Sequence, residues 1–174
     1  RIATPQYRTA TLIETQVGDE MPSFKGRDAM RGRLDRFGVE LLERTVVPHN
    51  EAAITTALSE SEGEFVLLLT ASATSDPMDV GPQALRQAGG EVTGFGMPVD
   101  PGNLLFFGQL DAKPVIGLPG CARSPALNGA DWVLERLICG ISLSQGDIAA
   151  MGVGGLLKEI PTRPQPRARV QPRT

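Results

Sequence analysis

The chain has 174 residues, which is enough for one domain with a sizeable core. Its formal net charge of −3 provides no basic surface of the kind that nucleic acid requires, and its longest aliphatic or aromatic run, Phe65–Leu69, is far too short to cross a bilayer. Cys121 and Cys139 do not make a disulfide framework. We therefore expect a cytoplasmic globular protein that binds neither nucleic acid nor membranes.

Apolar periodicity predicts the first elements of the chain. Tyr7–Glu14 is expected to form a strand, and Gly26–Phe37 a helix with apolar residues on one face. Val39–Val47 is expected to form a second strand. Asn50 is a good N-cap for a helix over Glu51–Ser59.

The middle of the chain contains the strongest strand pattern. Phe65–Leu69 has five apolar residues without polar alternation, which indicates a central strand buried on both faces, within an expected strand from Glu64 to Thr70. A loop of small polar residues follows, and a helix is expected to begin near Asp79 or Val80 and to end at Gly89-Gly90.

Four more elements complete the predicted fold. We expect strands at Glu91–Met97, Leu104–Phe107 and Lys113–Gly117, the last two joined by the segment Gly108–Ala112. A turn over Leu118–Ser124 then leads into a helix that ends near Ile138. The alternation of strands and helices predicts an α/β three-layer sandwich, with a mostly parallel central sheet and helices on both faces.

The end of the chain differs in composition. Residues 161–174 contain four prolines, four arginines and almost nothing apolar, so this segment does not fold alone. We therefore assign residues 1–160 to the domain and Pro161–Thr174 to a linker or tail. An anion site on its arginines is the alternative to a solvated linker.

Three loops are candidates for a ligand site, because ligands of open α/β sheets bind beyond the carboxyl ends of the strands. They are Thr15–Lys25, Thr70–Asp79 and Leu118–Ser124. The second loop offers hydroxyl groups and free backbone amides before a helix N-terminus, an arrangement suited to an anion. The predicted ligand-binding residues of this loop are Thr70, Ala71, Ser72, Thr74, Ser75 and Asp76. Capping of the helix is the alternative role for Asp76 and Asp79.

The third loop joins another strand to a helix. Its predicted ligand-binding residues are Pro119, Gly120, Cys121, Arg123 and Ser124. Arg123 suits a phosphate or is a plain exposed arginine, and Pro125 suits a first helical turn. Cys121 offers a thiol enzyme as a further hypothesis, because helix N-termini lower the pKa of a thiol.

Support for a metal site is restricted to carboxylates. Asp19 and Glu20 are candidates to join Asp79 around a magnesium ion that carries phosphates, and a solvated turn is the alternative. The chain has neither paired Cys or His spacing nor a Gly-rich nucleotide fingerprint.

Five motifs in order resemble the molybdopterin-binding family of the MogA/MoeA type. Glu14–Met21 is similar to a T-G-D-E-L turn, and Val46–Asn50 to V-V-P-D-x. Thr70–Asp79 stands where the family has T-G-G-x-S-x-G-x-x-D. Pro101–Leu104 resembles P-G-K-P, and Lys113–Gly120 matches K-P-V-x-G-L-P-G almost position for position.

This resemblance implies a site for molybdopterin or molybdenum cofactor at the strand ends, in a protein that often forms oligomers. Some members adenylate molybdopterin with magnesium and a nucleotide, and others insert molybdenum. By position, Asp79 inherits the catalytic acidic residue, and Gly120 and Ser124 inherit the family's L-P-G-N-P-x-S turn. Phe95, Phe106 and Phe107 are either core residues or a contact surface.

Several substitutions depart from the family pattern. Ala71-Ser72 replaces Gly-Gly, so the backbone is less free to approach a ligand. His49 replaces an aspartate, and Asn103 replaces a lysine. We therefore expect retained anion binding with altered catalysis, and rank a binding module above a magnesium-dependent adenylyltransferase or insertase.

The variant turn L-P-G-C-A-R-S-P and the segment after Met151 resemble a narrower subgroup. In that subgroup the domain is fused to a C-terminal nucleotidyltransferase that makes the cytidine form of the cofactor. The resemblance implies that this chain holds the cofactor for such a partner domain.

Overall fold

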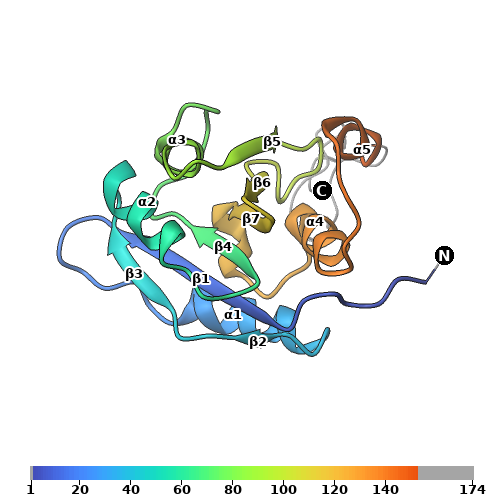
Figure 1. The fold of residues 1–174 in the computed structure, drawn as a ribbon, viewed down its shortest axis with the longest axis horizontal. Coiled ribbons are helices and arrows are strands. Elements are labelled where there is room, and N and C mark those ends of the chain that lie inside the picture. Colours follow the sequence, from blue (N-terminus) through green and yellow to red (C-terminus); the bar gives the residue numbers. More distant parts are fainter. Residues whose placement is uncertain (1, 153–174) are drawn as a thin grey trace, which may run out of the picture.

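The protein is a three-layer α/β sandwich, described by a computed structural model over residues 2–152 (Figure 1). The sheet has seven strands: β1 (Thr9–Gln16), β2 (Glu40–Leu41), β3 (Thr45–Pro48), β4 (Phe65–Leu69), β5 (Glu91–Phe95), β6 (Phe106–Leu110) and β7 (Lys113–Leu118). The expected tail at 161–174 and the end of the expected domain lie outside the described residues.

The strand order is β2-β1-β4-β7-β6-β5, and β3 also pairs with β1. Strand β1 pairs in parallel with β2, β3 and β4, and β4 pairs in parallel with β7. Strand β6 runs antiparallel to both of its neighbours, β5 and β7. The predicted fold class, a mostly parallel sheet between helices, is therefore confirmed. The carboxyl ends of β1, β4 and β7 meet at one edge of the sheet.

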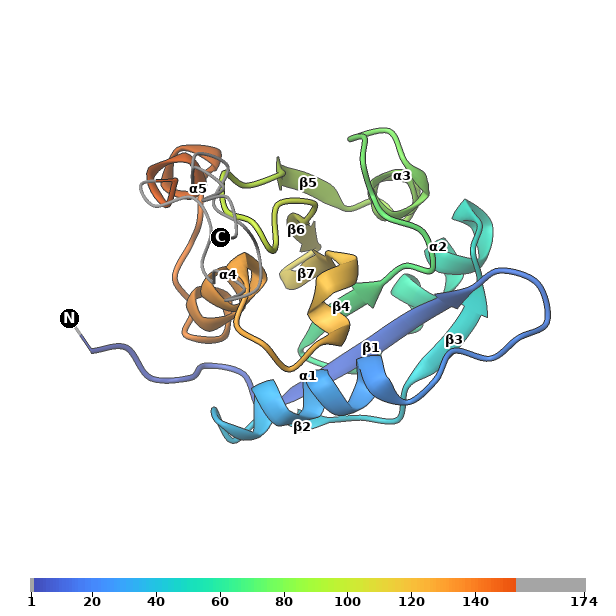
Figure 2. The ribbon, with the colours of Figure 1, turned by 180° about the vertical axis from the view of Figure 1, so that it is seen from behind.

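Helices cover both faces of this sheet, as Figures 1 and 2 show from opposite sides. They are α1 (Lys25–Asp35), α2 (Glu51–Ser59), α3 (Val80–Gln87), α4 (Gly129–Ile138) and α5 (Gln145–Ala150), with a short 3₁₀ helix η1 at Gly120–Arg123. Side chains of α1, α4 and α5 share one core cluster with the sheet, and those of α2 and α3 share the other. No helix among residues 2–152 is long and apolar enough to span a membrane.

Several predictions from the sequence concern buried elements, and the structure confirms them. All five residues of β4 are buried, as expected for a strand covered on both faces. Asn50 caps α2 by accepting a hydrogen bond from the amide of Ala53 at 2.9 Å. Phe106 and Phe107 belong to the core, and the half-buried Phe95 packs against it.

Most predicted strands agree with the structure to within two residues at each end, but two differ further. The single strand expected at Val39–Val47 is divided into β2 and β3, and the guanidinium of Arg44, between them, turns back to the carboxylate of Glu14. The strand expected at Leu104–Phe107 is β6, which continues to Leu110. Asp111, with φ of 53°, closes the hairpin to β7, so Gly108–Ala112 is mostly strand.

Gly117 of β7 lies under the ring of Phe106, and a Cβ atom there would stand 1.9 Å from Cε1. We expect Gly117→Ala to lower the free energy of unfolding by about 1–3 kcal/mol, because the core must shift to admit the methyl group. Gly32→Ala is the matched control, since a Cβ atom on this helical glycine meets nothing within 4 Å. It should stabilise by about 0.5–1 kcal/mol, and equal effects of the two changes in urea titrations would contradict the packing.

Candidate functional site

Three loops converge at the carboxyl edge of the sheet, as predicted, and side chains tie them to one another. Thr15, buried at the end of β1, accepts a hydrogen bond at Oγ1 from the amide of Ala71 at 2.7 Å. Arg123 at the end of η1 donates from Nη2 to the carbonyl of Thr70 at 2.8 Å. The loop after β4 is therefore held from both sides, by the strand β1 and by the turn after β7.

The loop Thr70–Asp79 divides its side chains between structure and surface. Thr70 and Thr74 are buried, and the hydroxyl of Thr70 donates to the carbonyl of Ser72 at 2.7 Å. The other predicted ligand residues of this loop, Ala71, Ser72, Ser75 and Asp76, are exposed at the sheet edge. The two threonines thus shape the loop, and the exposed residues are the ones positioned to meet a ligand.

Asp79 occupies the N-cap position of α3, but its side chain does not cap that helix. Its Oδ2 accepts hydrogen bonds from the amides of Ser75 at 2.7 Å and Asp76 at 3.0 Å. These backbone bonds, first that of Ser75, lower the pKa of the Asp79 carboxyl below its ordinary value, and His49 adds a smaller effect in the same direction. The capping role that the sequence offered for Asp79 is therefore wrong: the carboxylate organises the loop before the helix.

Asp76 makes a local contact only. Its Oδ1 accepts a hydrogen bond from the amide of Met78 at 2.7 Å, two residues along the chain. This is the short Asx arrangement typical of turns, so Asp76 also does not cap α3 through its side chain.

The turn after β7 differs from the predicted one. Instead of a helix that begins at Pro125, η1 covers Gly120–Arg123, and α4 begins at Gly129 after the N-cap Asn128. A capping box between Asn128 and Asp131 fixes that start. Arg123 consequently lies away from the N-terminus of α4, and the electrostatic argument for an anion at that point does not apply.

A cleft of about 720 Å³ opens beside this turn. The residues that line it are Lys25, Asp28, Ala29, Gly120, Cys121, Arg123, Ser124 and Pro125. Four of the five ligand residues predicted in this turn therefore lie on one cavity, and the fifth, Pro119, is buried next to it in the chain. Lys25 and Arg123 bring two cationic side chains to the walls of the cleft, against the single carboxylate of Asp28. This excess of positive charge suits a ligand with an anionic group.

The first turn of α1 reaches the cleft because the preceding loop is anchored. Arg44 donates from Nη1 to Oε2 of the buried Glu14 at 2.9 Å and to the carbonyl of Pro22 at 3.2 Å. Its guanidinium also lies 4.2 Å from the ring centroid of Phe24. The loop between β1 and α1 projects beyond the strand ends (Figure 1). The contacts of Arg44 nevertheless fix its last residues, next to Lys25, where α1 begins.

Cys121 is half-buried on the wall of the cleft. Burial raises the pKa of its thiol and outweighs a backbone hydrogen bond at Cys121 that lowers it; the carboxylates of Asp100 and Asp131 add to the rise, and the guanidinium of Arg33 opposes it. A raised pKa keeps the thiol protonated at neutral pH, which is the opposite of what a thiol nucleophile requires. The structure therefore provides no support for the thiol-enzyme hypothesis.

The carboxylates suggested as magnesium ligands are not assembled. Asp19 and Glu20 lie exposed on the loop after β1. Within residues 2–152 no group of three or more His, Cys, Asp or Glu side chains is placed to hold a metal ion.

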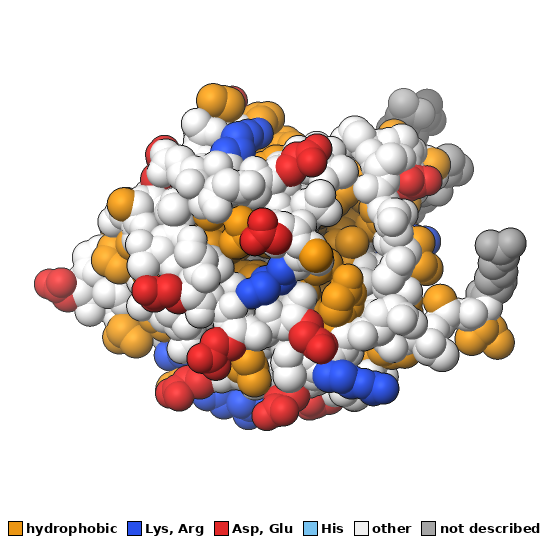
Figure 3. Space-filling model, in the orientation of Figure 1, with side chains coloured by type: hydrophobic (Ala, Val, Ile, Leu, Met, Phe, Trp, Pro, Cys, Tyr) orange, Lys and Arg blue, Asp and Glu red, His pale blue; other side chains and the backbone are white. Residues whose placement is uncertain are grey.

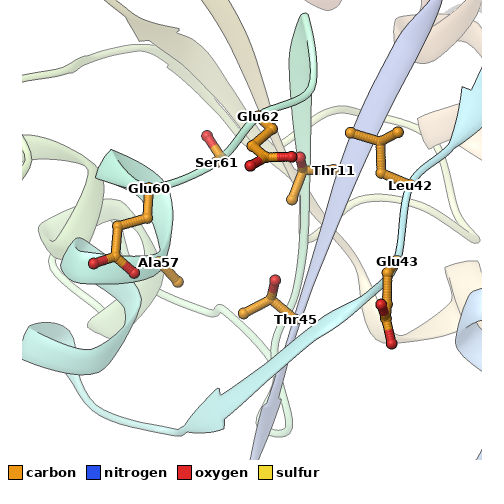
Figure 4. A pocket seen from close by; sticks show the side chains of 8 residues that line it. All are labelled: Thr11, Leu42, Glu43, Thr45, Ala57, Glu60, Ser61 and Glu62. Carbon is orange, nitrogen blue, oxygen red and sulfur yellow. The ribbon is translucent and has the colours of Figure 1, made fainter.

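A second pocket, of about 250 Å³, lies beside β1 where β2 gives way to β3 (Figure 4). Its walls include the carboxylates of Glu43, Glu60 and Glu62. Because three carboxylates repel an anionic ligand, the cleft at η1 is the better ligand site. Over the face drawn in Figure 3, acidic and basic side chains are interspersed, without a continuous basic stripe.

Sequence reasoning missed the residue that holds the cleft together. The buried Arg33 of α1 donates from Nε to Oδ1 of Asp131 at 2.6 Å, across 98 residues of chain. Its Nη1 and Nη2 atoms donate to the carbonyls of Ala122, Ser124 and Ala126 at 2.9 to 3.1 Å. A signal was present, because an arginine between Met30 and Leu34 interrupts the apolar face of the helix.

Comparison with known proteins identifies the family of the chain. A family model described as a probable molybdopterin binding domain matches residues 17–138. The chain belongs to this molybdopterin-binding domain family. No curated protein matches the chain.

Among solved structures, the crystal structure of the molybdopterin biosynthesis moea protein from Pyrococcus horikosii is similar, with a TM-score of 0.54 and 18% sequence identity. The match covers 82% of this chain and 36% of that one, so this chain corresponds to about a third of its neighbour. At this identity the likeness concerns the fold, and it supports the three-layer architecture.

Replacement of Arg33 tests the anchor of the cleft. Arg33→Ala should lower the free energy of unfolding by about 3–5 kcal/mol, because it leaves the Asp131 carboxylate buried without its partner. Arg36→Ala, one turn along α1, is the control: its side chain is 62% exposed and its contact with Glu135 is 3.9 Å long. We expect a change below about 0.5 kcal/mol there. Similar losses from both variants in chemical denaturation would contradict the role of Arg33.

Asp79 gives the loop a defined response to pH. Because its pKa is lowered in the folded protein, the stabilisation is complete above the ordinary aspartate pKa and is lost as the pH falls through the lowered value. Asp79→Asn should therefore reduce the free energy of unfolding at neutral pH, and it should flatten the loss of stability on acidification. Thermal unfolding measured across a range of pH checks both effects. Asp111→Asn, in the β6–β7 turn, should keep the wild-type profile. An unchanged profile in Asp79→Asn would rule out this role.

Proposed function

We propose that this chain is a binding module that holds molybdopterin, or its molybdenum-loaded form, and presents it to a nucleotidyltransferase domain. Membership of the molybdopterin-binding family supports a role in molybdenum-cofactor biosynthesis. The ligand lies across the cleft at η1 and the loop after β4, with its pterin against the cleft walls and its anionic groups toward Lys25 and Arg123.

The observation that carries the binding role is the state of Asp79. Its Oδ2 is already an acceptor for the amides of Ser75 and Asp76, so the carboxylate shapes the loop. An ionised carboxylate with a lowered pKa is a poor proton donor. Preorganised loops reduce the entropic cost of binding, which is what a carrier of a labile cofactor requires.

The residues of the cleft fit an extended anionic pterin. Lys25 and Arg123 supply positive charge, and Gly120 leaves one wall open. A cleft of about 720 Å³ lies within the range of small-molecule sites. Arg123 has the strongest position, because the same guanidinium lines the cleft and donates to Thr70 in the neighbouring loop.

Titration of the purified protein with molybdopterin and with molybdenum cofactor tests the proposal. We expect binding without magnesium and ATP and no adenylated product when both are added. Arg123→Ala should weaken binding by tenfold or more, as expected for a charged hydrogen-bonding group. Arg31→Ala, an exposed arginine on α1 outside the cleft lining, is the matched control and should bind as the wild type.

Two outcomes would contradict the proposal. An ATP-dependent adenylated product that is lost in Asp79→Ala would make the chain an adenylyltransferase. If the protein binds neither pterin, the proposed ligand is wrong. Addition of a nucleotidyltransferase domain with a cytidine triphosphate substrate tests the handover, and we expect transfer of the bound pterin without its release to solution.

A further inference from the structure

We propose that His49 is a fixed hydrogen-bond donor toward the ligand, so that this site holds an anionic oxygen directly and without a divalent cation. This inference rests on the proposed function for the identity of the ligand. Its physical basis, however, lies in a hydrogen-bond network that can be measured in the protein alone.

The network begins at the end of β1. The buried Oγ1 of Thr15 lies 2.9 Å from Nδ1 of His49 and accepts a hydrogen bond from the amide of Ala71 at 2.7 Å. His49 itself is fixed by the strand pairing, because its amide donates to the carbonyl of Gln16 at 2.8 Å. The imidazole therefore stands at the junction of three segments of the sheet edge.

The direction of the bond between Thr15 and His49 follows from a count of donors. A threonine hydroxyl has one hydrogen to donate and two lone pairs to accept. Ala71 occupies one lone pair, and among residues 2–152 Nδ1 of His49 is the only acceptor that the Thr15 hydroxyl contacts. A buried hydroxyl hydrogen without a partner costs free energy, so the hydroxyl donates to Nδ1.

This direction determines what His49 offers to a ligand. With Nδ1 as the acceptor, the neutral ring carries its hydrogen on Nε2. Nε2 then has no lone pair with which to bind a metal or to take a proton. It is a donor, suited to a phosphate or carbonyl oxygen, and a protonated ring would keep a donor at the same atom.

Position connects this donor to the ligand site. His49 follows β3, which pairs in register with β1 up to Gln16 and Pro48. Through Thr15 it is linked to Ala71, at the start of the loop that carries Ser75, Asp76 and Asp79. A carboxylate at position 49 would repel an anionic oxygen unless a cation lay between them, whereas an N–H group binds that oxygen directly.

The first test needs no ligand, and it is simplified because His49 is the only histidine of the chain. The ¹⁵N shifts of its ring, recorded where the ring is neutral, should show the Nε2–H tautomer in the wild type and in Thr15→Ser. In Thr15→Val the preference should be lost. Thr45→Val, on exposed β3, is the control and should leave the ring unchanged. An Nδ1–H tautomer, or a mixture in the wild type, would overturn the proposal.

The second test uses molybdopterin with and without magnesium. The wild type should bind equally well in both conditions, whereas His49→Asp should lose tenfold or more in affinity without magnesium and recover when it is added. Wild-type binding that requires magnesium, or His49→Asp that binds as the wild type, would overturn the proposal. If the wild type binds no pterin, the proposed function fails along with the ligand role of His49, while the tautomer result still shows whether the network was assigned correctly.

Discussion

The architecture of the cleft depends on one buried guanidinium. Arg33 makes an ion pair with Asp131 at 2.6 Å and hydrogen bonds with the carbonyls of the segment from Ala122 to Ala126. All of its nitrogen atoms are used, which offsets the cost of burying a charge. Asp131 simultaneously completes the capping box of α4 through the amide of Asn128. The start of α4, the turn after β7 and the helix α1 are therefore parts of one unit.

The candidate site is consequently held in place by side chains that do not line the cleft. Thr15, Arg44 and Arg33 each contact a neighbouring loop from a buried or half-buried position. The exposed groups that remain are the small hydroxyls of the loop after β4 and the cations of the cleft. The charge of such a surface suits an anionic ligand, and the surface stays in place because its supports belong to the core.

The elements that the sequence predicts well are those with strong local signals. The strand β4 follows from five consecutive apolar residues, and α2 from Asn50 with the apolar stripe behind it. The division between β2 and β3 has no such signal, because it depends on a distant contact. The guanidinium of Arg44 donates a hydrogen bond to the carboxylate of Glu14, thirty positions earlier in the chain. The late start of α4 likewise reflects the capping box around Asn128, which competes with Pro125 for the first helical turn.

The sequence by itself determined the α/β class, the main alternation of strands and helices, and the loops that form the candidate ligand site, because hydrophobic periodicity and turn residues are local properties. Only the tertiary structure decided the roles within those loops. In the structure, the Asp79 carboxylate accepts hydrogen bonds from amides of its own loop, Arg123 donates to the carbonyl of Thr70, and the imidazole of His49 contacts the hydroxyl of Thr15. Two of these contacts join residues that are far apart in the chain and come together at one edge of the sheet. A local pattern of residues does not predict such long-range contacts.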